Sequence, residues 1–224
     1  MSMVDEPSPE DLVRAARRAG VRDERVLEAI RITPRTAFVP AGHVASAYFD
    51  VPVPIPHGQV TTQPSLVAMM VSALGLTGRE RVLEVGTGYG YQTALLARLA
   101  TYVVSVERWP DMVEEARRRL VREGLGNVEI VLGDGTRGVP AGAPYDAVIV
   151  SAAFPQVPEP LVGQLRIGGP LVQPIGPGGR EQVELYERRA DGLEHRGTIV
   201  WARFVRLYGA HGYPADDEDT RRQR

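Results

Sequence analysis

Three glycines follow a short apolar stretch near the middle of the chain, and their spacing is typical of a nucleoside-binding loop. Residues 81–90 read Arg-Val-Leu-Glu-Val-Gly-Thr-Gly-Tyr-Gly, which places glycines at Gly86, Gly88 and Gly90. Glycine lets the main chain turn with positive φ and approach a ligand closely, because it has no Cβ atom. A dinucleotide-binding fingerprint needs its third glycine one residue later, where this chain has Tyr91. The pattern therefore predicts a nucleoside cofactor and disfavours a dinucleotide.

Two acidic residues stand where the next strands are expected to end. The apolar run 102–106 predicts a strand closed by Glu107, whose carboxylate can accept hydrogen bonds from both hydroxyls of a ribose. The run 128–132 predicts a further strand, followed by Gly-Asp-Gly at 133–135. Asp134 is placed to accept a hydrogen bond from an adenine amino group, and the flanking glycines leave room for the base. A solvated loop carboxylate at Glu107 and a surface Asp-Gly turn at Asp134 are the competing interpretations.

Helical and strand patterns alternate along the chain, which is the order of a doubly wound α/β fold. Helices are expected at 10–19, 23–32, 65–74, 92–100, 110–123 and 158–165. Besides a first strand that leads into the glycines, strands are expected at 102–106, 128–132, 145–151, 168–175, 182–188 and 198–205. We therefore expect a Rossmann-like, seven-stranded, mostly parallel sheet with an N-terminal helical cap.

One domain is expected to span residues 10–213. Its first part, 10–75, would form the helical cap and a substrate-side segment, and 76–213 would form the Rossmann-like core. The polar ends, 1–9 and 214–224, lack apolar periodicity and are expected to be disordered tails.

Composition argues against several classes of protein. The 224 residues include no cysteine and only four scattered histidines, so neither disulfides nor a metal site is expected. The formal net charge is −2, which gives no reason to expect nucleic acid as a partner. No apolar run reaches the roughly 18 residues that a membrane span needs, and the N-terminus lacks a signal-peptide core. We expect a cytoplasmic monomer that does not bind membranes.

Taken together, these motifs resemble the protein-L-isoaspartate (D-aspartate) O-methyltransferase family, whose members are class I methyltransferases that use S-adenosyl-L-methionine (AdoMet). The pattern Glu-x-Gly-x-Gly-x-Gly resembles the first AdoMet motif, and the resemblance extends from about Leu12 to Gly209. The matching segments, in family order, are 38–40, 58–64, 82–94, 105–108, 133–135, 143–153, 165–169 and 203–207.

The resemblance implies transfer of a methyl group from AdoMet to the α-carboxyl of L-isoaspartyl residues in damaged proteins or peptides, which starts repair through a succinimide. The cofactor-binding residues that it implies are Glu84, Gly86, Thr87, Gly88, Gly90, Gln92, Glu107, Arg108, Asp134 and Gly135. The implied substrate-binding residues are Thr61, Thr62, Val205 and Arg206, and Thr62 is the candidate catalytic residue, a hydrogen-bond donor to the accepting carboxylate. Thr62 could instead cap the helix after Pro64, and Asp50 either lies near the substrate carboxylate or caps a loop.

Two departures from the family pattern lie on the substrate side. The family usually has serine where this chain has Thr62, and proline where it has Arg206. The threonine keeps the hydroxyl but narrows the pocket, and the arginine adds a charge where a peptide should lie. A methyltransferase for one dedicated ribosomal peptide, a small-molecule O-methyltransferase and a non-catalytic binding module therefore remain alternatives. A nicotinamide dehydrogenase is disfavoured by Tyr91 at the third-glycine position and by the absence of lysine, without which the chain cannot contain the catalytic Tyr-x-x-x-Lys motif.

Overall fold

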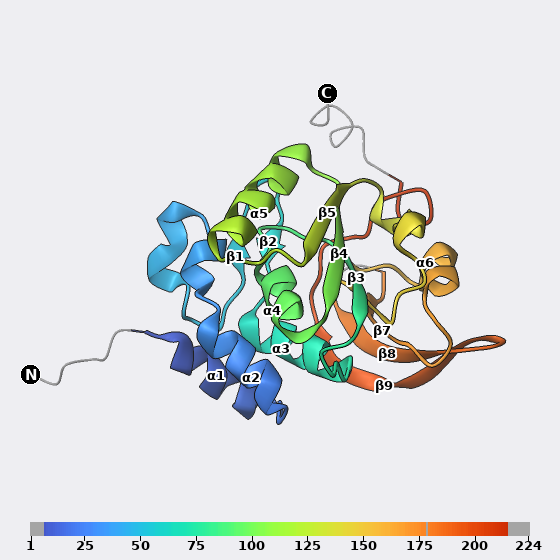
Figure 1. The fold of residues 1–224 in the computed structure, drawn as a ribbon, viewed down its shortest axis with the longest axis horizontal. Coiled ribbons are helices and arrows are strands. Elements are labelled where there is room, and N and C mark those ends of the chain that lie inside the picture. Colours follow the sequence, from blue (N-terminus) through green and yellow to red (C-terminus); the bar gives the residue numbers. More distant parts are fainter. Residues whose placement is uncertain (1–6, 178, 215–224) are drawn as a thin grey trace, which may run out of the picture.

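The computed structural model describes residues 7–177 and 179–214, and a seven-stranded sheet runs through its centre (Figure 1). The strands of this sheet are β3 (Arg81–Val85), β4 (Tyr102–Glu107), β5 (Val128–Leu132), β6 (Ala147–Val150), β7 (Pro170–Ile175), β8 (Glu181–Arg189) and β9 (Gly192–Ala202). Their order across the sheet is β5-β4-β3-β6-β7-β8-β9. Neighbours from β5 to β7 are parallel, and β8 and β9 are added antiparallel at one edge. The mostly parallel, seven-stranded sheet that the sequence predicts is confirmed.

The central strands are apolar because the protein covers both of their faces. In β3, Val82 belongs to the larger core cluster, whereas Leu83 and Val85 belong to the cluster on the opposite face. Side chains alternate along a strand, so Glu84 faces the same side as Val82 and lies opposite Ser105 of β4. The carboxylate of Glu84 is thus buried between the sheet and α4.

Helices cover the two faces of the sheet unequally. The α-helices of the described residues are α1 (Pro9–Arg18), α2 (Glu24–Ile32), α3 (Pro64–Ala73), α4 (Tyr91–Leu99), α5 (Pro110–Arg122) and α6 (Glu159–Gln164). Residues of α3, α4 and α5 pack in the larger core cluster, and α6 packs on the other face. Proline stands in the first turn of α1, α3, α5 and α6, where its missing N–H costs no helix hydrogen bond. Asp23 caps α2, because its side chain accepts a hydrogen bond from the N–H of Arg25.

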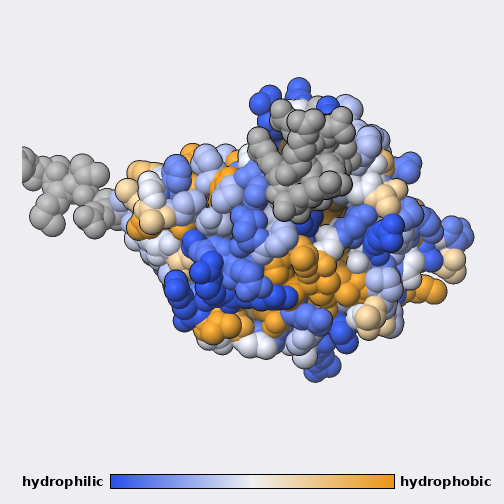
Figure 2. Space-filling view, turned by 90° about the horizontal axis from the view of Figure 1, so that it is seen from above, coloured by the Kyte–Doolittle hydropathy of each residue, from blue (hydrophilic) through white to orange (hydrophobic). Residues whose placement is uncertain are grey.

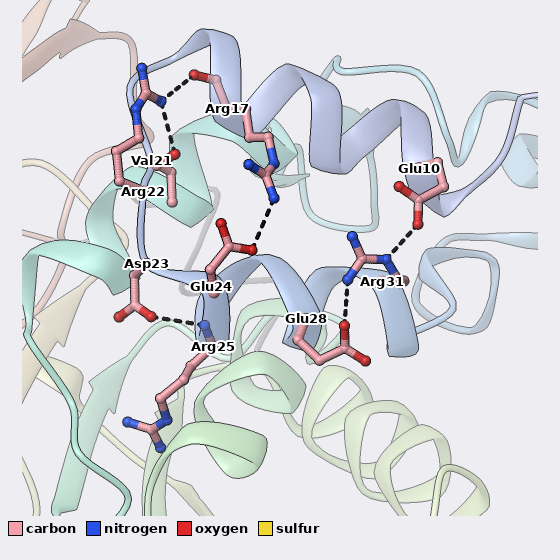
Figure 3. A network of polar contacts seen from close by, with 9 residues as sticks. All are labelled: Glu10, Arg17, Val21, Arg22, Asp23, Glu24, Arg25, Glu28 and Arg31. Atoms are coloured by element: carbon pink, nitrogen blue, oxygen red, sulfur yellow. Dashed lines mark hydrogen bonds and ion pairs between the residues drawn. The ribbon is translucent and has the colours of Figure 1, made fainter.

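Helices α1 and α2 form the expected N-terminal cap, which packs against α3 and α4 (Figure 1). Leu12 and Leu27 are fully buried there, and full burial of such a side chain contributes roughly 1.5–3 kcal/mol. On the outer surface Arg31 of α2 pairs with Glu10 of α1 at 2.5 Å (Figure 3). Exposed pairs of this kind contribute little, so apolar packing holds the cap in place.

Short elements connect the cap and the sheet. Between α2 and α3 lie the 3-10 helices η1 (Arg35–Phe38) and η2 (Ala41–Ser46) and a small antiparallel pair, β1 (Val53–Pro54) and β2 (Val60–Thr61). Between β5 and β6 lie η3 (Gly135–Arg137) and η4 (Pro140–Gly142). These connections carry four of the residues that the sequence assigns to a site: Thr61, Thr62, Asp134 and Gly135.

The structure corrects two expected boundaries. The last strand, expected at 198–205, begins at Gly192 and ends at Ala202, after which the chain leaves the sheet. The carbonyl of Val205 then accepts a hydrogen bond from the N–H of Ala153 at 2.7 Å. The expected tails, 1–9 and 214–224, lie mostly outside the described residues, but Pro9 already belongs to α1.

Seen from above, most of the surface is polar and apolar residues gather near the middle of the view (Figure 2). Among the described residues, no helix combines the length and the apolar character that crossing a membrane requires.

Candidate active site

A cleft of about 880 Å³ opens at the carboxyl ends of the central strands. Strand β3 has β4 on one side and β6 on the other, so the chain reverses its direction of winding at this point. Ligands of open α/β sheets bind at such switch points. The cleft is lined by the glycine loop after β3, the end of β4, residues from the 55–62 segment and residues 205–208.

The glycine loop has the backbone geometry that the sequence predicts. Gly86, Gly88 and Gly90 have φ values of +95°, +55° and +91°, a region that residues with a side chain rarely adopt. All three line the cleft, as does Thr87, whose hydroxyl lies 2.5 Å from that of Ser105. At these three glycines the loop presents bare backbone to the cleft.

Glu107 lines the cleft at the end of β4 and holds the glycine loop there. Its carboxylate accepts hydrogen bonds from the backbone N–H groups of Gly88 at 2.9 Å, Arg108 at 2.8 Å and Trp109 at 3.2 Å. Burial raises the pKa of Glu107 above its usual value, although these hydrogen bonds act in the opposite direction. A carboxylate offers about four acceptor positions, so capacity remains for a ligand hydroxyl. The competing interpretation, a solvated loop carboxylate, is wrong because the side chain is buried.

Glu84 lies behind the cleft and is not among the residues that line it. Its carboxylate accepts hydrogen bonds from Gln92, Thr93 and Ser105, and burial raises its pKa to about 7. The same Gln92 amide group donates to Ser151 at 2.9 Å, and both of these residues line the cleft. The Oε1 atom of Gln92 is buried without a partner among the described residues. Glu84 thus positions Gln92, which offers an unused acceptor at the cleft.

In the structure, the Asp134 side chain forms hydrogen bonds with other groups of the protein. Its carboxylate accepts from the N–H and hydroxyl groups of Thr136 and from the N–H of Ala210 at 2.8 Å. Asp134 does not line the cleft, whereas Gly135 does. A Cβ atom on Gly135 would lie 2.5 Å from Cγ1 of Val85, so glycine lets η3 pack directly against β3. The assignment of Asp134 to an adenine amino group stays a prediction.

On the opposite side of the cleft, the two candidate substrate threonines differ in their partners. The hydroxyl of Thr61 accepts a hydrogen bond from Arg35 at 3.0 Å, and the carbonyl of Thr62 accepts from the same guanidinium at 3.4 Å. Arg35 is fully buried, and burial lowers its pKa. No described residue makes a hydrogen bond with the Thr62 hydroxyl, and Thr62 lines the cleft. The geometry therefore leaves this hydroxyl available to a ligand.

Asp50, rather than Thr62, caps helix α3. Gln63 occupies the N-cap position, and its side chain does not cap the helix. The N–H of Ser65 instead donates to Asp50 at 2.8 Å, and the Gln63 amide donates to the second oxygen at 2.9 Å. Asp50 is thus a capping residue, although it caps a helix and not a loop, and the capping interpretation of Thr62 is wrong.

Val205 and Arg206 border the cleft from the C-terminal segment. In the described part of the chain nothing accepts a hydrogen bond from the N–H of Val205, whose carbonyl is bound to Ala153. The exposed guanidinium of Arg206 lies over the ring of Tyr213, 5.1 Å from its centre. Arg108 also lines the cleft and lies over the rings of Trp109 and Tyr208.

An apolar wall of Ile55, Trp109 and Met112 completes the cleft, and the sequence analysis did not assign these residues to it. His57 stacks on Trp109 with ring centres 3.9 Å apart. The indole Nε1 of Trp109 is buried and has no partner among the residues described. The sequence could have indicated Trp109, because this residue follows Glu107 by two positions and stands at the start of a helix. Ile55 comes from the cap segment and gave no local signal.

Comparison with known families shows which family this chain belongs to. The model of the protein-L-isoaspartate(D-aspartate) O-methyltransferase family matches residues 7–212. The chain belongs to this family. A protein-L-isoaspartate O-methyltransferase of Methanoculleus marisnigri is 47% identical over 209 residues, which are 92% of this chain and 94% of the relative. One from Anaeromyxobacter dehalogenans is 53% identical over 190 residues, which are 84% of this chain and 91% of that relative.

Two solved structures share the fold of this chain. A protein-L-isoaspartate O-methyltransferase superposes with a TM-score of 0.80 at 32% identity, covering 91% of this chain and 67% of its own. A Plasmodium falciparum protein in complex with S-adenosyl-L-homocysteine has the same fold, with a TM-score of 0.76 at 21% identity. That match covers 91% of this chain and 99% of the other.

Proposed function

We propose that this enzyme transfers a methyl group from AdoMet to the α-carboxyl of L-isoaspartyl residues in proteins or peptides. One observation supports this proposal in addition to family membership. The Thr62 hydroxyl and the Val205 N–H, two donors without partners in the described part of the chain, border the same cleft as the glycine loop. Donors of this kind suit a carboxylate that must be held close to a methyl donor.

The residues of the cleft fit AdoMet. The unused acceptor of Gln92 suits the ammonium group of the methionine moiety, and Glu107 suits the ribose hydroxyls. The apolar wall of Ile55, Trp109 and Met112 suits the flat face of adenine. Gly86, Thr87, Gly88, Gly90, Arg108 and Gly135 complete the proposed cofactor site, with Glu84 as support for Gln92.

The reaction requires little from the protein beyond positioning the carboxylate next to the methyl donor. Bound AdoMet would supply an electrophilic methyl group on a sulfonium. The accepting carboxylate has an ordinary pKa near 4 and is already ionised at neutral pH, so no general base is needed. Thr62 and the N–H of Val205 would orient its oxygens without protonating them. Well-oriented reactants gain roughly 7–11 kcal/mol in this way.

The ester product explains a repair role. A methyl ester at this carboxyl is attacked by the neighbouring backbone nitrogen, methanol leaves, and a succinimide forms. Hydrolysis of the succinimide returns part of the material to ordinary aspartate. We further propose that the enzyme acts as a monomer in the cytoplasm, as the sequence predicts.

Transfer of labelled methyl from AdoMet to two matched peptides tests this function. The peptides differ only in L-isoaspartyl against L-aspartyl at one position. We expect transfer to the isoaspartyl peptide and little to the other. Equal transfer to both, or none to either with AdoMet bound, would contradict the proposal and favour a dedicated peptide substrate or a binding role.

A further inference from the structure

A second hollow, here called the flanking groove, adjoins the cleft on the far side of Thr62. It has a volume of about 1550 Å³ and lies between α1, α3 and the end of β9. It shares Thr62, Ser151 and Val205 with the cleft, so the two spaces meet at the proposed carboxylate site. A polypeptide whose isoaspartyl residue reaches Thr62 would therefore place neighbouring residues in the flanking groove.

The flanking groove combines an apolar floor with two arginines. Leu66, Met69 and Trp201 provide the apolar surface, and Arg18 and Arg203 border it. Trp201 is 51% exposed, which is unusual for so large an apolar side chain.

The two guanidinium groups are exposed at the groove. No residue in the described ranges pairs with Arg18. Arg203 uses its Nε to donate to the carbonyl of Gly179 at 3.0 Å, which leaves its terminal N–H groups available. Asp50 is the one acidic residue along the described lining, and its oxygens are engaged in capping α3. The two arginines outnumber this one carboxylate, so the lining of the groove carries a net positive charge.

Two further arginines, Arg180 before β8 and Arg206 in the C-terminal segment, lie near this groove. Arg180 lies over the ring of Trp201, 4.8 Å from its centre. On the other side of Val205 a smaller hollow of about 720 Å³ is bordered by Arg203 and Arg206. Positive side chains thus stand on both sides of the point where the substrate carboxylate would bind.

We propose that the flanking groove binds the residues next to the isoaspartyl residue and favours substrates with acidic side chains there. This inference rests on the proposed function. Exposed pairs between arginine and carboxylate contribute about 0.2–1 kcal/mol each, which corresponds to a change of up to about fivefold in kcat/KM for each arginine. The preference should weaken at high salt because exposed charges are screened.

Three isoaspartyl peptides test the proposal, with Glu, Gln or Lys at the two positions on each side of the isoaspartyl residue. We expect kcat/KM to fall in the order Glu, Gln, Lys. The variants Arg18→Glu and Arg203→Glu should each lower the ratio between the Glu and Lys peptides about two- to fivefold. Arg122→Glu is the matched control, because Arg122 is exposed on α5 and borders none of these hollows. It should leave the ratio unchanged.

The Gln peptide separates the two hypotheses. Its methylation supports the proposed function whatever the flanking preference. If all three peptides react equally, or if neither variant changes the ratio more than the control, the inference about the groove is overturned and the function stands. If no isoaspartyl peptide is methylated, both are overturned.

Discussion

Thr62 is the residue on which the proposed reaction depends most directly. Its hydroxyl borders the cleft and has no partner within the described ranges, so a bound carboxylate would supply one. A hydrogen bond to a charged group contributes about 1.5–3 kcal/mol. Thr62→Ala should therefore lower kcat/KM for an isoaspartyl peptide about 10- to 100-fold, whereas Thr62→Ser should retain most of the activity.

The matched control for this pair is cofactor binding. Neither variant should change the Kd for AdoMet, because the glycine loop and Glu107 are untouched. Full activity in Thr62→Ala would show that the Thr62 hydroxyl has no role in the reaction.

Glu84 allows a test through the pH dependence of stability. Burial raises its pKa to about 7 in the folded protein, against 4.5 as the ordinary value. Between these values the unfolded chain loses a proton that the folded chain keeps, so the free energy of unfolding should fall as pH rises from about 4.5 to 7. The loss should be about 3 kcal/mol and complete above that range.

Glu84→Gln should remove this contribution to the slope, whatever it does to absolute stability. Urea unfolding of both proteins between pH 4.5 and 8 measures the difference. Parallel curves for the two proteins would show that Glu84 does not titrate in this window.

At the scale of elements, the loops between α2 and α3 are assembled around one buried cation. Arg35 of η1 donates to the carbonyls of Ala47, Phe49 and Val51 and to the hydroxyl of Thr61. Lysine cannot reproduce this planar set of donors. Arg35→Lys should therefore lower the free energy of unfolding by about 2 kcal/mol, at a cost of about 1 kcal/mol for each lost hydrogen bond.

Arg118→Lys on the exposed face of α5 is the control, and it should change stability by less than about 0.5 kcal/mol. Thermal or urea unfolding gives the comparison. Equal effects of the two substitutions would mean that Arg35 does not organise these loops.

The contact between η3 and β3 needs a residue without a side chain. A Cβ atom on Gly135 would lie 2.5 Å from Cγ1 of Val85, whereas one on Gly126 would meet nothing within 4 Å. Gly135→Ala should lower the free energy of unfolding by about 1–3 kcal/mol through overpacking. Gly126→Ala should be nearly neutral. Similar urea midpoints for both variants would contradict the close approach of η3 to the sheet.

For the whole molecule, the features that could be predicted from the sequence are those that depend on local sequence patterns. Buried parallel strands are continuous apolar runs, and the glycine loop and Glu107 stand at their ends, so the central sheet and the cofactor side of the cleft could be inferred. The engagement of Asp134 by Ala210 could not, because it joins residues 76 positions apart. The same holds for the flanking groove, whose lining comes from both ends of the chain.

The end of β9 was mispredicted for a related reason. Residues 198–205 alternate as a strand does, but the pairing partner changes after Ala202. From there the chain turns to Ala153, three residues after the end of β6, which brings Val205 to the cleft. Alternation in the sequence predicts an extended backbone and does not identify its neighbour.

The proposed repair reaction can be tested by following one isoaspartyl peptide over time with AdoMet and enzyme, using chromatography and mass spectrometry. We expect a methyl ester first, then the succinimide, then a growing fraction of the aspartyl peptide. Without AdoMet the isoaspartyl peptide should persist unchanged. An isoaspartyl peptide that stays unmodified with AdoMet bound, or an ester that forms equally on the aspartyl peptide, would contradict the central claim.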